Sequence, residues 1–555
     1  MTLHRFDKWD WVLSLALALV AALAVMLTSH LVGLVRDEGF YMRTAETTAD
    51  YIQFSLDSIG RGQFAEPFSK RTITRFFEFN SEHPTFVKNL FGLSHFIFYK
   101  KLKLLSFVDS IRLVAALFAA ATAFLIYLFG RRFFSRAVAI AAPPLFFTMP
   151  HIFFHSHLAC FDVPILFFWT ATFILYAIYL VERRTGLAFL IAVLFGFAMA
   201  TKHNVYFIPP LLALLWLAMH VLHYRSLEPR HKGFVGFFRA VPLPLWLMPT
   251  VSLPVFFLSW PWLWYDTVKR FGNYLAFHTY HVNYTNYYFG QELSVAPFPF
   301  SYPWGMTFFT TPVPQLVCFF AAIALFLCWM FGRGRTPVER HIGALLLIGA
   351  LFPIFLIALP SVPIFGGIKH FFTGQPILLT AGLAVVLGGA AELFRRWPKV
   401  KEQAVQGMVV AAALFVLVIP NAKFVMHGAG FFNALIGGAQ GAAEHYMQRN
   451  FWGYDILPLC PVLNAVAPRG AKVYVMSYAE GLNWNSFLYL KREGHIRNDI
   501  QGTNELRDAD FAFFFYEKQN ESVLYDLYRE FGTVRPLELS ETDSVYFSAL
   551  FGRVQ

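Results

Sequence analysis

Acidic side chains stand at the end of the first long apolar run of the chain. Asp37 and Glu38 follow this run directly. A carboxylate near a bilayer is costly, so its position carries information. Two interpretations are open: an ordinary helix end that enters water, or an acid pair that belongs to a site at the membrane surface. The dipeptide alone does not separate them, but its surroundings favour a site.

One of these surroundings is the stretch 76–92 (FFEFNSEHPTFVKNLFG). It is amphipathic and rich in aromatic residues, and it is too polar to span a membrane. The pattern predicts a helix that lies in the membrane interface. Such a helix would bring Glu82, His83 and Lys88 to the same membrane face as Asp37.

Three short turns between apolar runs carry further polar groups. For the turns with Asp162 and Lys202, each taken alone, helix capping or snorkelling is an alternative interpretation. The joint pattern favours one common site, because the loops on the other side carry only ordinary basic clusters. The turns contain His155, His157 and Asp162; Lys202 and His203; and Lys369 and His370, which follow Gly366-Gly367, a pair that permits a tight backbone.

A longer polar segment, residues 261–304, is dense in aromatic side chains. His278 and His281 lie three residues apart in it, which is one helical turn. Two histidines at this spacing could bind a metal ion, but the segment offers no third ligand nearby. An interfacial aromatic belt that also contacts a sugar or a lipid is the favoured interpretation.

The elements that must position these residues are membrane helices. Apolar residues make up 57% of the 555 residues and charged residues 14%, whereas a soluble domain has about 25% charged residues. The net charge of +11 lies mostly in short clusters between apolar runs, so it indicates topology and not nucleic-acid binding.

The apolar runs predict about eleven spans, since about 20 residues cross the hydrocarbon core. The basic clusters all fall on one side, which the positive-inside rule assigns to the cytoplasm. The N-terminus is then cytoplasmic and the C-terminus external. The runs are 9–35, 107–130, 137–154, 162–181, 187–201, 204–222, 241–260, 305–331, 342–360, 371–391 and 405–424.

The fold class that we predict is an α-helical polytopic membrane protein with a small external α/β domain. The membrane domain is 1–424, with a first outer loop at 36–106 that holds interfacial helices and a second at 261–304. Residues 425–555 form the external domain. In that domain, 471–476 and 511–516 predict buried strands, 522–531 a helix and 544–550 a closing strand.

Read in order, these motifs resemble the protein O-mannosyltransferase-like branch of the GT-C glycosyltransferases, which includes the bacterial aminoarabinose transferases acting on lipid A. The resemblance covers about residues 5–425. Thr85 after Pro84, and His157 where many relatives have arginine, leave donor and acceptor identity open. The motifs are Asp37-Glu38, His83-Pro84, Arg112, RRFFSR at 131–136, His157 with Asp162, Thr201-Lys202 and WPWLW at 260–264.

The resemblance implies a GT-C fold with a cavity that opens outward and a polyprenyl-phosphate sugar as donor. Asp37 would be the catalytic base and Asp162 would assist it, by positioning the acceptor or by sharing a divalent cation. Glu38 would support the loop or bind sugar. Lys202, Lys369, His83 and His370 would hold the lipid phosphate. An obligatory metal is not expected, although Mg²⁺ or Mn²⁺ between Asp37 and Asp162 stays open.

The function that we predict is inverting sugar transfer to a hydroxyl or phosphate of an envelope glycan, lipid A or a protein. The expected location is a bacterial inner membrane, with the C-terminal domain in the periplasm. The expected partners are the lipid-linked donor, the acceptor and membrane lipid, without nucleic acid. The alternatives are a lipid or solute transporter, including a flippase, and a non-catalytic scaffold. A transporter places its ionisable groups near the bilayer midplane, whereas here they gather at one surface.

Overall fold

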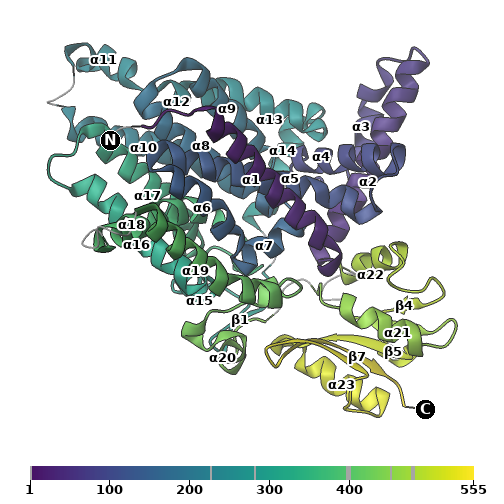
Figure 1. Ribbon diagram of the computed structural model, residues 1–555. Helices are drawn as coiled ribbons and strands as arrows, with labels where there is room; N and C mark the ends of the chain where they lie inside the picture. The colour runs from purple at the N-terminus through teal and green to yellow at the C-terminus, as the bar shows by residue number, and fades with distance from the viewer. Residues whose placement is uncertain are drawn as a thin grey trace.

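The computed structural model describes residues 3–224, 228–280, 283–394, 402–449, 453–476 and 482–554. The protein is a polytopic helical membrane protein with a small sheet domain at its C-terminus (Figure 1). Among the described residues, 7 helices are long and apolar enough to span a bilayer. They are Lys8–Leu31, which contains α1 (Lys8–Thr28); α5 (Phe107–Phe133); α8 (Asp162–Glu182); His203–Leu222, in which a 3₁₀ turn leads into α10 (Ile208–Leu222); α16 (Val313–Phe331); α17 (Pro337–Ile357); and Phe372–Leu393, in which a 3₁₀ turn leads into α18 (Gln375–Phe394).

Two further spans are bent helix pairs, which brings the total to up to 9 in the described part of the chain. Helices α6 (Arg136–Phe147) and α7 (Pro150–His157) meet at 72°. Helix α11 (Gly233–Ala240) and the segment Leu243–Ser259, which contains α12 (Leu243–Leu247) and α13 (Leu253–Ser259), meet at 81°. Proline opens α7, and Pro242 precedes α12. Proline fixes φ and lacks an N–H, so a helix breaks there and restarts in a new direction.

The remaining two predicted spans have weaker support. The run 187–201 forms α9 (Thr185–Met199), whose 15 residues extend only about 22 Å. That is shorter than a hydrocarbon core of about 30 Å. The run 405–424 forms α19 (Glu402–Lys423), but part of this helix lies outside the described side chains. Helices thus form along all the predicted runs, although the run 305–331 is divided between Tyr302–Thr310 and Val313–Phe331. In the described part of the chain, 7 helices meet the length and apolarity of a span, or up to 9 if each bent pair counts as one.

The first outer loop contains more helix than the sequence indicated. It begins with α2 (Arg36–Gly60), 25 residues long, which was not predicted. The prediction of one interfacial helix over 76–92 is wrong: α3 (Lys70–Phe77) and α4 (Phe86–Ser94) are separated by a turn. Pro84 explains the break, because proline disfavours a helical conformation at the preceding residue.

The second outer loop contains α14 (Thr267–Thr279), a hairpin of β1 (Asn286–Tyr288) and β2 (Gln291–Leu293), and α15 (Tyr302–Thr310). The WPWLW motif forms a 3₁₀ turn just before α14. Lys70 pairs with Asp266, with 2.8 Å between Nζ and Oδ2. The first and second outer loops are thereby joined.

The C-terminal domain has a five-stranded sheet in the order β4-β3-β5-β7-β6. Both β3 (Lys472–Val475) and β5 (Phe511–Phe515) form where strands were predicted, as do α23 (Glu521–Phe531) and β7 (Val545–Gly552). The edge strands β4 (Gln501–Thr503) and β6 (Glu538–Thr542) were not predicted. All five side chains of β5 are buried, as expected for a central strand that is covered on both faces.

This domain packs directly against the start of the outer loop. Helix α22 (Leu482–Arg492) lies beside α2 (Figure 1). Tyr489 donates a hydrogen bond to Glu46 at 3.0 Å, and Arg492 pairs with the same carboxylate. Gly33 lies so close to Tyr454 that an added Cβ would be 1.8 Å from the Tyr454 carbonyl oxygen. The apolar cores of α2, α4 and the sheet domain form one continuous cluster.

Candidate active site

The Asp37 carboxylate lies in the first turn of α2, which begins where the chain leaves the first span. The positive end of the helix dipole stabilises an anion there. Lys369 Nζ donates a hydrogen bond to Asp37 Oδ2 at 3.0 Å. Arg36 Nε lies 3.6 Å from Asp37 Oδ1. Asp37 is thus a carboxylate held between two cations, with 21% of its side chain exposed.

Lys369 reaches Asp37 because of a tight turn. Gly366 and Gly367 have φ values of 73° and 59°, which favour glycine. A Cβ on Gly366 would lie 2.2 Å from Cε of Lys369. The two glycines therefore let the backbone fold under the lysine side chain and direct it toward Asp37.

Asp162 forms a second pair of the same kind. It is the first residue of α8, again at a helix N-terminus. Lys202 Nζ donates to Asp162 Oδ1 at 3.0 Å, and His155 Nδ1 lies 4.0 Å from Asp162 Oδ2. The side chain of Asp162 is 6% exposed. A buried carboxylate needs such a partner to stay ionised.

These two pairs line one cavity of about 290 Å³. Loops and helix ends from both halves of the membrane domain converge on it. Its wall contains the predicted residues Asp37, Glu82, His83, Asp162, Lys202, His203, His278, Lys369 and His370. It also contains Arg36, Phe40, Tyr41, Asn80, Pro84, Cys160, Phe161, Phe277, Tyr284 and Phe365.

The histidines form an aromatic wall of this cavity. The rings of His203 and His278 are 4.0 Å apart between centroids, and His83 lies 5.7 Å from His278. Tyr41 contacts Phe161, with 4.2 Å between ring centroids. Flat rings beside charged groups suit the two faces of a sugar, one apolar and one polar.

The charges around the cavity set the protonation of its groups. Burial raises the pKa of Asp37, but the positive charges of Lys369 and Arg36 outweigh it and hold the pKa below its ordinary value of 3.8. Burial, together with the charge of Lys88, holds the pKa of His83 well below its ordinary value of 6.5. At neutral pH, Asp37 is therefore an anion that can accept a proton, and His83 is a neutral ring.

Three of the predicted site residues lie behind the cavity wall. Glu38 is fully buried and accepts hydrogen bonds from Arg112 Nε and Nη2, both at 2.8 Å. It also accepts one from the Ala159 N–H at 2.9 Å. His157 is buried against Thr28, with 2.8 Å between its Nε2 and Thr28 Oγ1. Contacts with protein therefore occupy the polar groups of both side chains.

Lys88 is the third of these residues. Its Nζ donates to the carbonyl oxygens of Asn80 at 2.6 Å and His83 at 2.8 Å. Burial lowers the pKa of Lys88 to about 7. The lysine thus fixes the turn that carries His83. His281, the remaining predicted residue, lies outside the described residues.

Sequence reasoning missed several wall residues. Arg36 was overlooked although it precedes Asp37, and its guanidinium lies 5.0 Å from the Tyr284 ring centroid. Asn80 donates to Glu82 at 2.8 Å, and both lie in the turn before Pro84. Adjacency to a predicted residue was the available signal for Arg36 and Asn80. Tyr41 could have been found only from the register of the unpredicted helix α2.

The wall residues do not form an obvious metal site. Within the described residues, no group of three or more His, Cys, Asp or Glu side chains could hold a metal ion. Asp37 and Asp162 each face a lysine ammonium at 3.0 Å, and an ammonium repels a cation. As arranged here, the two carboxylates fit a shared divalent cation poorly.

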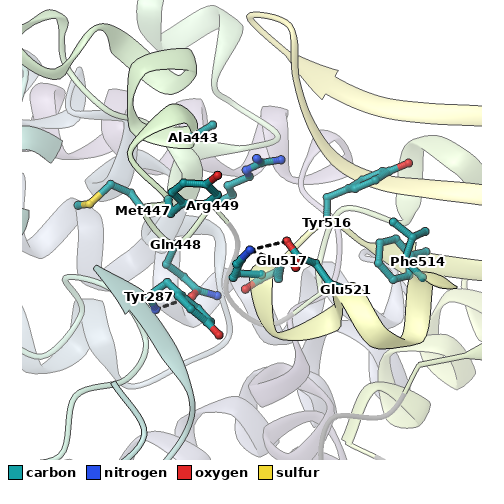
Figure 2. A pocket seen from close by; sticks show the side chains of 12 residues that line it. Tyr287, Ala443, Met447, Gln448, Arg449, Phe514, Tyr516, Glu517 and Glu521 are labelled. Carbon is teal, nitrogen blue, oxygen red and sulfur yellow. Dashed lines mark hydrogen bonds and ion pairs between the residues drawn. The ribbon is translucent and has the colours of Figure 1, made fainter. Parts of the chain in front are cut away.

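A second cavity, of about 170 Å³, lies where the sheet domain meets the β1–β2 hairpin (Figure 2). Tyr287 and Gln448 lie on one side of it, and Phe514 and Tyr516 on the other. Lys518 pairs with Glu521 at 2.9 Å in its wall. None of the predicted site residues lines this cavity, so the Asp37–Asp162 cavity is the candidate active site.

Residues 83–246 match the model of the dolichyl-phosphate-mannose-protein mannosyltransferase family. Over this range, the match confirms the predicted resemblance to the protein O-mannosyltransferase-like branch of the glycosyltransferases. The matched range contains His83, Asp162 and Lys202. No curated protein matches the chain by sequence.

Several solved structures are similar to the chain at low sequence identity. ArnT from Cupriavidus metallidurans bound to undecaprenyl phosphate is 13% identical, with a TM-score of 0.45 over 98% of each chain. The apo state of the same protein is 14% identical, with a TM-score of 0.46 over 97% of each chain. The oligosaccharyltransferase AglB from Archaeoglobus fulgidus, in complex with an inhibitory peptide and a dolichol-phosphate, is 12% identical, with a TM-score of 0.45 over 95% of this chain and 72% of that one.

Proposed function

We propose that this protein is a glycosyltransferase that moves a sugar, a hexose or a pentose, from a polyprenyl-phosphate donor to an acceptor outside the membrane, with inversion. The observation that carries the proposal is the pairing of two carboxylates with two lysines in one cavity at the ends of membrane helices. The family matched by residues 83–246 is named for a lipid-phosphate sugar donor, and this supports the donor class.

Asp37 acts as the general base in this proposal. It takes the proton of the acceptor hydroxyl while the acceptor oxygen attacks the anomeric carbon of the sugar. The bond between that carbon and the phosphate oxygen breaks, and its electron pair stays on the phosphate. Attack from the face opposite the leaving group inverts the anomeric centre.

Lys369 and Lys202 stabilise the departing phosphate. Each ammonium is already in the cavity wall, 3.0 Å from its carboxylate, so it needs no large movement to meet new negative charge. His83, neutral at pH 7, and His370 supply further polar contacts to the phosphate. Asp162 orients the acceptor and keeps Lys202 in place.

The aromatic and histidine wall contacts the sugar, and the polyprenyl chain lies in the membrane beside the cavity. The acceptor that we favour is an envelope glycan or glycolipid of a bacterial inner membrane, such as lipid A, with a protein hydroxyl as second choice. The C-terminal domain then lies in the periplasm and covers the acceptor side.

The test is sugar transfer by the purified full-length protein in lipid, with a panel of polyprenyl-phosphate sugars and a membrane extract as acceptor. Asp37→Asn is expected to lower the rate by about a hundredfold or more. Asp57→Asn, an exposed carboxylate on the same helix, is the matched control and should keep full activity.

Two outcomes would contradict the proposal in different ways. Full activity of a folded Asp37→Asn protein would remove Asp37 from the role of base. No transfer from any donor by the wild type, with lipid movement across the bilayer instead, would show a transporter.

A further inference from the structure

A large basic cavity lies at the membrane face opposite the candidate active site. Helix α8 connects the two: Asp162 begins it, and Arg183 follows its last residue. Its 21 residues extend about 31 Å, enough to cross the hydrocarbon core. The cavity at the Arg183 end has a volume of about 740 Å³. The positive-inside rule assigns this face to the cytoplasm.

The wall of this basic cavity is rich in cations and imidazoles. It includes Arg183, Arg230, Arg239, His220, His231 and His341. Its lining, all within the described residues, contains no carboxylate. The nearest acid in sequence to Arg183 is Glu182, which pairs with Arg132 and Arg184. Arg230 pairs with Glu228 at 2.6 Å. The charges of Arg183 and Arg239 meet no carboxylate in the described wall of the cavity.

His341 gives a second, independent indication of a ligand. It lies near the start of α17, and only 8% of its surface is exposed. Within the described part of the chain, its buried Nε2 has no hydrogen-bond partner. Buried polar atoms nearly always have a partner. Since His341 lines the basic cavity, a ligand there would provide one.

An apolar groove of about 570 Å³ continues from the basic cavity. The two share Trp216, Phe238, Val241 and Trp246 in their walls. Farther along, the groove is lined by Ala213, Pro210 and other apolar side chains of α9, α10 and the α12–α13 segment. Tryptophan at such a boundary is typical of the level where lipid head groups meet acyl chains.

We propose that this continuous surface binds an anionic phospholipid of the cytoplasmic leaflet. The phosphate lies in the basic cavity between Arg183, Arg239 and His341, and an acyl chain lies in the groove. Basic pockets beside membrane helices bind phospholipid head groups in this way. The groove is the reason to choose a lipid over a free anion, because inorganic phosphate would leave it unused.

The test is binding to the purified full-length protein in detergent, measured by native mass spectrometry. The probes are dioleoyl phosphatidylglycerol, dioleoyl phosphatidylcholine and inorganic phosphate. We expect retention of phosphatidylglycerol and little of the other two. Arg239→Gln should weaken phosphatidylglycerol binding about tenfold, because it removes a charge-assisted hydrogen bond. Arg333→Gln removes one charge from another loop of the same face, outside the cavity, and should leave binding unchanged.

The groove is tested by Ala213→Phe, which fills it. This variant should weaken binding of the dioleoyl lipid and leave that of dihexanoyl phosphatidylglycerol unchanged. Equal losses in Arg239→Gln and Arg333→Gln would show non-specific attraction and overturn the proposal. Equal binding of phosphatidylcholine, or phosphate that competes fully with the lipid, would also overturn it.

Discussion

Two adjacent carboxylates lie in different environments in this protein. Asp37 and Glu38 are adjacent carboxylates, yet only Asp37 reaches the cavity. Glu38 accepts hydrogen bonds from Arg112 and from the Ala159 N–H. It thereby connects the start of α2, which carries Asp37, to the loop that ends at Asp162. We infer that Glu38 positions both site carboxylates and does not contact substrate.

The first residue-scale prediction concerns this buried pair. Glu38→Ala leaves the fully buried Arg112 guanidinium without its counter-ion, which costs about 3–5 kcal/mol of unfolding free energy. Denaturant unfolding in detergent measures the loss. Glu78→Ala, an exposed glutamate of the same outer loop, should change stability by about 0.5 kcal/mol or less. Similar stability of the two variants would refute the structural role.

A second prediction at this scale concerns pH. Asp37 has a pKa below 3.8 because Lys369 and Arg36 outweigh its burial. The acid limb of the rate profile of the wild type should therefore lie below that pH. Of these two cations, Lys369 lowers the pKa of Asp37 more. Lys369→Gln should therefore raise this pKa and move the acid limb to higher pH.

The measurement is kcat/KM against pH for the wild type and Lys369→Gln, with Lys269→Gln, an exposed lysine of α14, as control. If the acid limb of Lys369→Gln stays at the wild-type pH, the ionisation of Asp37 does not control the rate. By linkage, the lowered pKa of Asp37 also stabilises the fold above pH 3.8, and this stabilisation is lost as pH falls through the folded-state pKa.

At the scale of elements, short turns between helices place the site groups. The turn between α3 and α4 carries Glu82 and His83 and is fixed from behind by Lys88. Lys88→Met leaves the partly buried carbonyl groups of Asn80 and His83 without their hydrogen-bond donor. The substitution should lower the free energy of unfolding by about 1–3 kcal/mol. It should also raise KM for the sugar donor more than it lowers kcat.

Unfolding and steady-state kinetics, with Lys269→Met as the control on an exposed helix face, check this prediction. A normal KM in Lys88→Met would show that the turn holds its shape without the lysine.

The sequence predicts features that depend on neighbouring residues, and it misses those that depend on contacts between distant parts of the chain. Asp37, Asp162, Lys202 and Lys369 could be found because a charge at the end of an apolar run is conspicuous. Strands β3 and β5 could be found from their apolar runs. The direction of Glu38, His157 and Lys88 depends on partners far along the chain or across a turn, as Arg112 is for Glu38. Helix α2 was missed because its sequence has no long apolar run to mark it.

At the scale of the molecule, the sheet domain and the membrane domain form one apolar core near the exit of the first span. Gly33 is the point of closest approach. Gly33→Ala should force the Tyr454 backbone away, cost about 1–3 kcal/mol and make the C-terminal domain more sensitive to protease. Limited proteolysis and thermal unfolding measure this.

Gly60→Ala is the matched control, because a Cβ there meets nothing within 4 Å. Equal protease resistance of the two variants would show that the domains do not depend on this contact.

The glycine pair below Lys369 has a consequence for how such a site can evolve. Gly366 and Gly367 adopt conformations that other residues rarely adopt, and a Cβ on Gly366 would collide with the side chain of Lys369. Substitutions at these two glycines would therefore disturb the turn and are not a means of changing the substrate specificity. The histidine and aromatic wall has no such backbone restriction. A lineage could exchange those side chains to accept another sugar while the lysine stays fixed by two residues that have no side chain to vary.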